Sequence, residues 1–296
     1  MIMPKDDSIE LHRIALQYLE GNDVEKDYPK SYKYFLEAAE LGNPISMYFI
    51  GLMYRNGFGI QHDDKKAFEW YLKSAELNYE KAQFQIASDY KVGLGIEKNE
   101  LESLKWYKKS AESGLMLAQE ILGQIYLEGT GVKRDYHQAY SWLLPSAKQG
   151  SIISQESLGN MFRDGIGVEK SNTISMKWYK KAAKQGAVNS QNMVATILLE
   201  GLNRGDIDSL DSFDSYKPIP KVFKWYLRAA KQGCKSAQLN VGKMYRKGLG
   251  TDTNDYEALR WYQRAGAINY PNLQFEIGVM FIHLDESEKA EKHLLK

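Results

Sequence analysis

Residues 115–150 read LMLAQEILGQIYLEG, TGVKRD and YHQAYSWLLPSAKQG, and the hydrophobic spacing of this stretch decides the fold. In the first segment, Ala118, Leu122 and Tyr126 recur every four residues, which places them on one face of an α-helix. In the last segment, apolar and small residues form a wider stripe at helical spacing: Ala139, Trp142, Leu143, Ser146 and Ala147. The stretch therefore predicts two helices, which we name helix A and helix B, joined by a short turn.

The same unit repeats along the chain, and tryptophan marks its period. All six tryptophans hold one position of the repeat, 36 residues apart except for one step of 47: Trp70, Trp106, Trp142, Trp178, Trp225 and Trp261. Such a period is typical of stacked helix pairs. Regular units are expected at 43–78, 79–114, 115–150, 151–186, 187–233 and 234–269, between a degenerate unit at 8–42 and a shortened unit at 270–296 that stops soon after its second helix begins. We predict an all-α fold, a single domain over 1–296 that forms an α/α right-handed superhelical solenoid of about eight helix-pair repeats.

Glycines and capping residues predict the helix ends. A pair of glycines follows helix A in five units, where the first suits a left-handed helix end: Gly57/Gly59, Gly93/Gly95, Gly129/Gly131, Gly165/Gly167 and Gly248/Gly250. Asp63, Asn99, Asp135 and Asp255 are expected to cap helix B. A further glycine recurs inside helix A, as at Gly51, where glycine costs about 0.5–1 kcal/mol relative to alanine. We expect helices A and B to approach closely there, with the tryptophan of helix B alongside.

The unit 187–233 carries eleven extra residues between its two helices. The segment 202–220 reads LNRGDIDSLDSFDSYKPIP, which is rich in aspartate and contains two prolines. It is predicted to be a surface loop and a secondary contact for a partner. A calcium-binding loop is excluded, because counting from Asp206 puts Asp211 and Lys217 at the positions that need glycine and glutamate.

The repeated motifs identify a family resemblance. Residues 46–60, SMYFIGLMYRNGFGI, and 66–78, KAFEWYLKSAELN, resemble the Sel-one-like repeat (SLR) family, relatives of tetratricopeptide repeats, and the chain holds six clear and two degraded copies. The resemblance implies an α/α superhelix that acts as an adaptor or scaffold for protein complexes. Some bacterial members are immunity proteins that neutralise secreted toxins. Ala87 and Ala195 replace the glycine of helix A, so the units 79–114 and 187–233 are expected to pack less regularly.

The composition of the chain limits the classes of binding partner and the cellular compartment that we expect. The chain has 39 basic and 38 acidic residues, so its formal net charge of +1 gives no reason to expect nucleic acid or an anionic membrane. Cys234 is the only cysteine, which excludes a disulfide or a thiolate metal cluster within one chain. The first ten residues lack the features of a signal peptide, and no run of about 18 apolar residues occurs. We therefore expect a cytoplasmic protein without a membrane span.

The sequence offers little for catalysis. Its five histidines lie at no common repeat position and never four residues apart, which disfavours a metal site. Cys234 begins a helix A but has no histidine nearby in sequence, so an inert thiol is favoured. We predict no metal, no cofactor and no enzymatic activity. A hydrolase, as suggested for cysteine-rich relatives, is a weaker alternative, because those proteins carry paired cysteines in each repeat.

By analogy with tetratricopeptide arrays, helix A lines the concave groove and three of its register positions point inward. The candidates for partner binding are basic, polar and aromatic residues at these positions: Tyr48, Arg55, Phe84, Lys91, Gln124, Asn160, Arg163, Lys243 and Arg246. The register position of Tyr48 and Phe84 is held in the other units by Glu120, Glu156, Asn192, Leu239 and Phe275. Such a groove favours an acidic peptide or protein segment. The alternative is that cations in the last turn of helix A are stabilised by the helix dipole alone, by about 0.3–1 kcal/mol each.

The most direct function is a non-enzymatic scaffold or adaptor that binds a protein or peptide partner in the groove. The alternative is an immunity or regulatory protein that neutralises one specific toxin or effector. Exchange of Arg55, Arg163 and Arg246 for glutamate is expected to weaken partner binding and to leave the thermal stability nearly unchanged.

Overall fold

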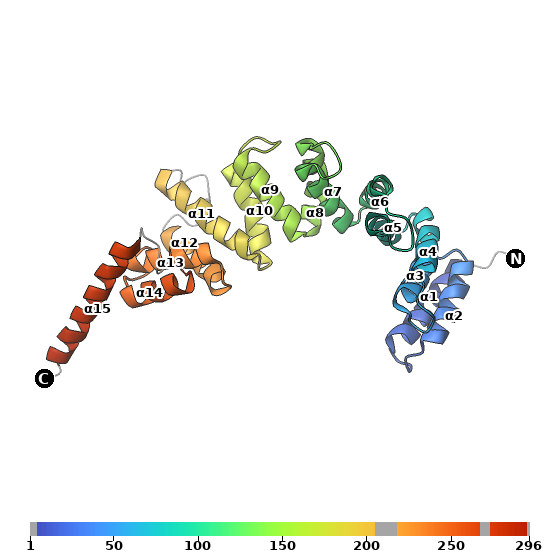
Figure 1. Ribbon diagram of the computed structural model, residues 1–296, viewed down its shortest axis with the longest axis horizontal. Helices are drawn as coiled ribbons and strands as arrows, with labels where there is room; N and C mark the ends of the chain where they lie inside the picture. The colour runs from blue at the N-terminus through green and yellow to red at the C-terminus, as the bar shows by residue number, and fades with distance from the viewer. Residues whose placement is uncertain (1–4, 205–217, 267–272, 295–296) are drawn as a thin grey trace. The chain divides into compact units, whose positions relative to one another are not determined.

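The computed structural model describes residues 5–204, 218–266 and 273–294, and every regular element in these ranges is an α-helix. Figure 1 shows the helices following one another as neighbouring pairs. The all-α repeat fold predicted from the sequence is therefore confirmed. The chain divides into two compact units, Met1–Ser151 and Ile152–Lys296. The single domain over 1–296 stays a prediction.

The first compact unit holds four helix pairs, in which each helix packs against the next along the chain. Its helices are α1 (Lys5–Glu20), α2 (Tyr28–Glu40), α3 (Pro44–Asn56), α4 (Asp64–Glu76), α5 (Glu80–Val92), α6 (Glu100–Glu112), α7 (Met116–Glu128) and α8 (Tyr136–Gln149). Odd-numbered helices correspond to helix A of the sequence repeat, and even-numbered helices correspond to helix B.

The described residues of the second compact unit form three helix pairs and a final helix. Its helices are α9 (Ile152–Asp164), α10 (Asn172–Lys184), α11 (Val188–Arg204), α12 (Pro218–Lys231), α13 (Lys235–Lys247), α14 (Asp255–Arg264) and α15 (Gln274–Leu294). The second helix expected to begin within 270–296 is absent from the described residues, because α15 continues to Leu294. Both ends of the segment predicted as a loop at 202–220 are helical, since α11 extends to Arg204 and α12 begins at Pro218; its centre, 205–217, lies outside the described residues.

Local chemistry fixes the helix ends largely as the sequence predicts. The glycine after α3, Gly57, has a left-handed φ of 69°, and the corresponding glycines after α5, α7 and α13 are also left-handed. Asp63 accepts a hydrogen bond from the Lys66 backbone N–H at 3.0 Å and so caps α4. The predicted cap at Asp255 is wrong. Asn254 caps α14 instead, by accepting from the Glu257 backbone N–H at 2.9 Å, and Asp255 is the first residue of the helix.

Glycine inside helix A permits close packing, but tyrosine rather than tryptophan lies against it. A β-carbon added at Gly51 would lie 2.5 Å from Cε1 of Tyr71 on α4. Gly159 and Gly242 face a helix B tyrosine in the same way, and Gly123 faces Leu143. The expectation that tryptophan fills this space is therefore wrong: the residue that follows the tryptophan fills it. Successive residues on a helix point about 100° apart, so Trp70 and Tyr71 serve different surfaces.

The tryptophans lie at the contacts between successive repeats. Trp70, for example, packs against a core cluster that contains Phe35 of the preceding repeat and Ile50 of its own repeat. Five indoles are also covered by the basic side chain one turn later, with the charged group 3.9–5.0 Å from the ring centroid: Trp70, Trp106, Trp178, Trp225 and Trp261. Such cation–π contacts are worth about 0.5–1 kcal/mol at exposed sites. Trp142 has Pro145 in that place.

Candidate functional site

The predicted groove residues lie on the helix A members of both compact units. Their structural roles differ, and three groups can be separated: side chains already committed to the core, arginines already paired with carboxylates, and residues that line a cavity. For each group, the contacts show how far its residues are available to the predicted partner.

Tyr48 and Phe84 contribute to packing. The Tyr48 ring is half-buried, with its centroid 5.5 Å from that of Tyr71 and 5.4 Å from that of Tyr79, and this burial raises the pKa of the Tyr48 hydroxyl. The Phe84 ring makes an edge contact with Tyr107 at 5.4 Å. Both rings connect neighbouring helices, so neither lies fully open to a ligand.

Arg55 is tied into the fold. Its Nη1 and Nη2 atoms donate to the two carboxylate oxygens of Asp89 on α5 at 3.0 and 2.8 Å, and its Nε atom lies 3.0 Å from Oδ1 of Asp64. The side chain of Arg55 is 14% exposed and that of Asp89 only 1%. Burial raises the pKa of Asp89, and the guanidinium of Arg55 opposes that shift. A Glu at position 55 would put a third carboxylate beside two others, so the structure does not support the expectation that reversal there leaves stability unchanged.

The other two predicted arginines are also paired. Arg163 on α9 makes a forked contact with its neighbour Asp164, with nitrogen–oxygen distances of 2.8 and 2.7 Å. Arg246 on α13 lies 3.4 Å from Asp255, which also contacts Nδ1 of His283 at 3.0 Å. The charges of all three arginines are thus balanced inside the protein, which removes the main argument for an acidic partner along this surface.

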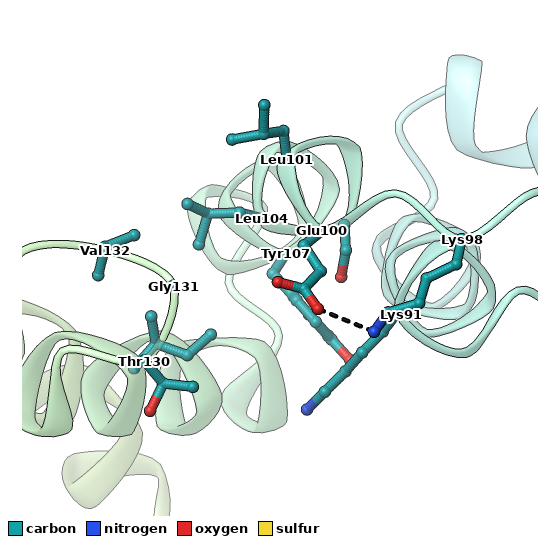
Figure 2. Close-up of a pocket in the computed structure, with 11 residues that line it drawn as sticks. Lys91, Lys98, Glu100, Leu101, Leu104, Tyr107, Thr130, Gly131 and Val132 are labelled. Atoms are coloured by element: carbon teal, nitrogen blue, oxygen red, sulfur yellow. Dashed lines mark ion pairs between the residues drawn. The ribbon is translucent and has the colours of Figure 1, made fainter.

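Gln124, Lys243 and Lys91 differ in exposure. Gln124 on α7 and Lys243 on α13 are partly exposed. Lys91, in the last turn of α5, is exposed and makes no ion pair with any residue that the structure describes. Lys91 lines a cavity with residues of α6 and of the turn after α7, which Figure 2 shows.

In the second compact unit, Asn160 and Arg163 line a cleft of about 270 Å³ between α9, α10 and α11. Its remaining wall consists of Glu156 and Asn192, which share the register position of Tyr48, and of three residues that the sequence analysis did not select: Tyr179, Asn189 and Met193. The repeat register marks Asn192 as a surface position, but nothing in the sequence shows that three asparagines meet at one place. Their meeting depends on how α9 and α11 pack.

Most polar groups of this cleft are mutually satisfied. The Tyr179 hydroxyl donates to Oδ1 of Asn160 at 2.6 Å, and burial raises the pKa of Tyr179 to about 12, so the hydroxyl keeps its proton at neutral pH. Ser190 donates to Oε1 of Glu156 at 2.7 Å. One acceptor differs: Oδ1 of Asn192 is buried and has no hydrogen-bond partner among the described residues. A buried acceptor without a donor costs about 1–3 kcal/mol, so Asn192 is the residue of this cleft with an unmet hydrogen bond.

Metal binding and membrane insertion were also expected to be absent. No group of three or more histidine, cysteine, aspartate or glutamate residues lies close enough to hold a metal ion there. The thiol of Cys234 contacts the hydroxyl of Ser236 at 3.2 Å. None of the described helices is long and apolar enough to cross a membrane.

Comparison with known proteins agrees with the repeat analysis. The Sel1 repeat model matches residues 11–43, 44–79, 80–115, 117–151, 152–186, 223–234 and 235–270. Of the predicted unit 187–233 only the last part lies in a matched range, and residues 271–296 lie in none. No curated protein matches the chain in sequence.

Two crystal structures show the same fold. A protective antigen present in uropathogenic Escherichia coli strains, which displays an SLR fold, is 30% identical, with a TM-score of 0.60 over 93% of this chain and 64% of that one. A Sel1 repeat protein from Oxalobacter formigenes is 26% identical, with a TM-score of 0.61 over 94% of this chain and 75% of its own. The chain thus spans less than two thirds of the first relative. Repeat motifs, helix pairs and family match agree, and the chain belongs to the Sel1 repeat family, whose members are generally protein-interaction scaffolds.

Proposed function

We propose that this chain is a non-enzymatic scaffold that holds an extended segment of a protein partner in the cleft between α9, α10 and α11. The observation that carries the proposal is the buried, unpaired Oδ1 atom of Asn192 beside the side chains of Asn160 and Asn189. An asparagine amide offers one acceptor and two donors, so it pairs with the N–H and C=O groups of a peptide main chain. In this mode the cleft binds the main chain of the partner, whereas the sequence analysis favoured a partner that is recognised by its acidic side chains.

The charges of the cleft support main-chain recognition. Arg163 is neutralised by Asp164, and Glu156 adds a carboxylate that already accepts from Ser190. The cleft therefore presents amides and acceptors rather than a free cation. Once the amide of Asn192 rotates toward the cleft, a partner segment that supplies an N–H group satisfies its oxygen, and the carbonyls of the segment meet the amide donors of the neighbouring asparagines.

The test compares two effects of Asn192→Leu, a change that keeps the approximate size of the side chain. Because the substitution removes a buried acceptor without a partner, we expect the free energy of unfolding to stay the same or to rise by about 1 kcal/mol. Because it also removes the hydrogen bond to the partner, we expect a loss of binding. The full-length chain is used to recover partners from lysate of the source organism, which are identified and quantified by mass spectrometry.

Asn56→Leu is the matched control, since Asn56 is an exposed asparagine at the end of α3. We expect the same partner to be recovered with the control and with the unchanged chain, and to be depleted with Asn192→Leu. Equal recovery with all three proteins would exclude the cleft as the binding site. A single partner recovered at a one-to-one ratio favours a dedicated inhibitor or immunity protein, whereas several partners favour an adaptor.

A further inference from the structure

The turn after α7 stands away from α6, which distinguishes it from the turns after α3, α5 and α13. In those three turns, the second glycine lies directly against the start of the preceding helix B. A β-carbon on Gly59 would lie 2.5 Å from Cβ of Tyr28, one on Gly250 would lie 2.7 Å from the carbonyl oxygen of Ile219, and one on Gly95 would overlap the carbonyl of Asp64. A β-carbon on Gly131 would meet no described atom within 4 Å.

The separation leaves a cavity of about 320 Å³ between α5, α6 and the turn after α7. Figure 2 shows Leu101 and Leu104 on one side of it, and Thr130, Gly131 and Val132 on the other. Its walls are mainly aliphatic and aromatic, formed by Leu101, Leu104, Tyr107, Ile125 and Val132. Leu101 is 71% exposed, so the apolar surface continues to the rim of the cavity.

Two sequence differences coincide with the cavity. Ile60 and Ile96, the residues that follow the second turn glycine in the two preceding repeats, pack against core clusters of those repeats. The corresponding residue here is Val132, which is smaller and lines the cavity. The cavity also occurs at the repeat in which Ala87 replaces the glycine of helix A, and Tyr107 of that repeat forms part of its wall.

The charged rim has a net positive sign. Lys98 and Glu100 form an ion pair at 2.9 Å, and a dashed line marks this pair in Figure 2. Lys91 forms no ion pair with a described residue, although its charge also helps to lower the pKa of Glu100, so the lining carries one cation more than it has carboxylates. An apolar cavity with one free cation at its edge is complementary to an apolar side chain that lies close to a carboxylate.

We propose that this cavity anchors one large apolar side chain of a protein partner, from a segment that also carries an aspartate or glutamate to pair with Lys91. The inference rests on the proposed function, because it adds a second contact for a protein partner. A volume of about 320 Å³ lies at the lower end of ligand pockets, which favours one side chain over a folded element. Anchors of this kind, buried aromatic or aliphatic groups in a preformed pocket, supply most of the affinity of many protein interfaces.

The experiment selects ligands without assuming a partner. A library of random peptides displayed on phage is selected against the full chain, and the enriched peptides are synthesised with a fluorescent label and titrated by anisotropy. We expect the enriched peptides to share an aromatic or large aliphatic residue close to an aspartate or glutamate. Enriched peptides without this pair of residues would overturn the proposal.

Three variants locate the binding. Val132→Phe fills the cavity and is expected to raise the Kd of the peptide by about tenfold or more, since burial of one large side chain is lost. Lys91→Glu removes the cation and is expected to raise the Kd by about fivefold or more. Lys133→Glu changes an exposed lysine of the same turn that does not line the cavity, so the Kd should stay within about twofold.

If Val132→Phe lowers the helical signal, its effect on binding cannot be separated from unfolding. Leu101→Ser then replaces it as the test of the apolar contact. Leu101 is exposed, so its loss removes the apolar rim with little effect on folding, and we expect weaker peptide binding. Unchanged affinity in both Leu101→Ser and Lys91→Glu would overturn the proposal. Peptides that lose affinity with Asn192→Leu but with none of the cavity variants would support the proposed function and overturn this inference. A dimer of the chain that Lys91→Glu dissociates in sedimentation would also overturn it, because the occupant would then be a second copy.

Discussion

Arg55 on α3 and Asp89 on α5 form a two-pronged ion pair between adjacent repeats, 34 residues apart in sequence. Asp89 is almost completely buried and Arg55 is 14% exposed, so the pair is shielded from solvent and salt. The guanidinium also lies over the Tyr71 ring, 5.5 Å from its centroid. Arg55 therefore connects α3, α4 and α5, and its conspicuous charge serves the stacking of repeats.

Loss of Arg55 should destabilise the first compact unit strongly. Arg55→Met leaves the carboxylate of Asp89 buried without its cation, and breaking a buried pair from one side costs about 3–5 kcal/mol. Urea unfolding followed by circular dichroism measures the change. Arg163→Met is the control, because Arg163 is 34% exposed and Asp164 41% exposed, and exposed pairs contribute about 0–1 kcal/mol. Similar losses in both variants would contradict this role for Arg55.

The internal helix glycines should respond to alanine with opposite signs in different places. A β-carbon at Gly51 meets the Tyr71 ring at 2.5 Å, so Gly51→Ala should cost about 1–3 kcal/mol through overpacking, despite alanine's better helix propensity. Gly278 holds the same repeat position in α15, where a β-carbon meets nothing within 4 Å. Gly278→Ala should therefore stabilise the protein by up to about 1 kcal/mol. Thermal unfolding of both variants checks the signs, and a stabilising Gly51→Ala would show that Tyr71 moves freely.

The period of the repeat and most of its helix ends could be predicted from the sequence because they depend on local chemistry. A glycine such as Gly57 ends a helix through its own backbone freedom, and Asp63 caps α4 through a hydrogen bond three residues away. The partner of Arg55 depends on how one repeat stacks on the next, which spacing does not encode. The same limit explains why Tyr71, and not Trp70, lies against Gly51: the choice depends on the rotation of α4 about its own axis.

The surface positions of the candidate site could be predicted from the sequence, but their contacts could not. The register of helix A identifies surface positions, and it included Asn160, Arg163 and Asn192. It does not show which charges are balanced, because Asp164 and Asp255 approach their arginines only in the folded chain. Nor does it show the cavity at Val132, which arises from a turn that stands away from its neighbour and not from any unusual motif.

The turn glycines give a second test of that separation. Both Gly95 and Gly131 have positive φ, 74° and 71°, so alanine at either position incurs the left-handed penalty of about 1–2 kcal/mol. At Gly95 the new β-carbon also overlaps the carbonyl of Asp64, whereas at Gly131 it enters open space. We expect Gly95→Ala to be more destabilising than Gly131→Ala by about 1 kcal/mol or more. Equal losses in urea unfolding would mean that the turn after α7 packs against α6 in solution.

His12 should make the stability of the first compact unit depend on pH. Its ring lies 5.4 Å from Phe35 and 5.5 Å from Phe49, its Nδ1 atom contacts the Ser46 hydroxyl at 2.9 Å, and burial lowers its pKa. The folded chain then binds a proton less readily than the unfolded chain. The stability is therefore fully present above the unfolded pKa of about 6.5 and decreases as the pH falls below it.

The measurement compares the free energy of unfolding at about pH 7.5 and about pH 5.5, on either side of the unfolded histidine pKa. Carboxylates also titrate toward the lower value, so the decisive quantity is the difference between variants. In His12→Leu the apolar side chain stays between the two phenylalanines and cannot take up a proton, so the loss of stability on acidification should be smaller than in the unchanged chain. His137→Gln, which changes an exposed histidine of α8, should leave the pH dependence as it is. An equal loss in all three proteins would show that the His12 ring reaches solvent and accepts a proton without cost to the fold.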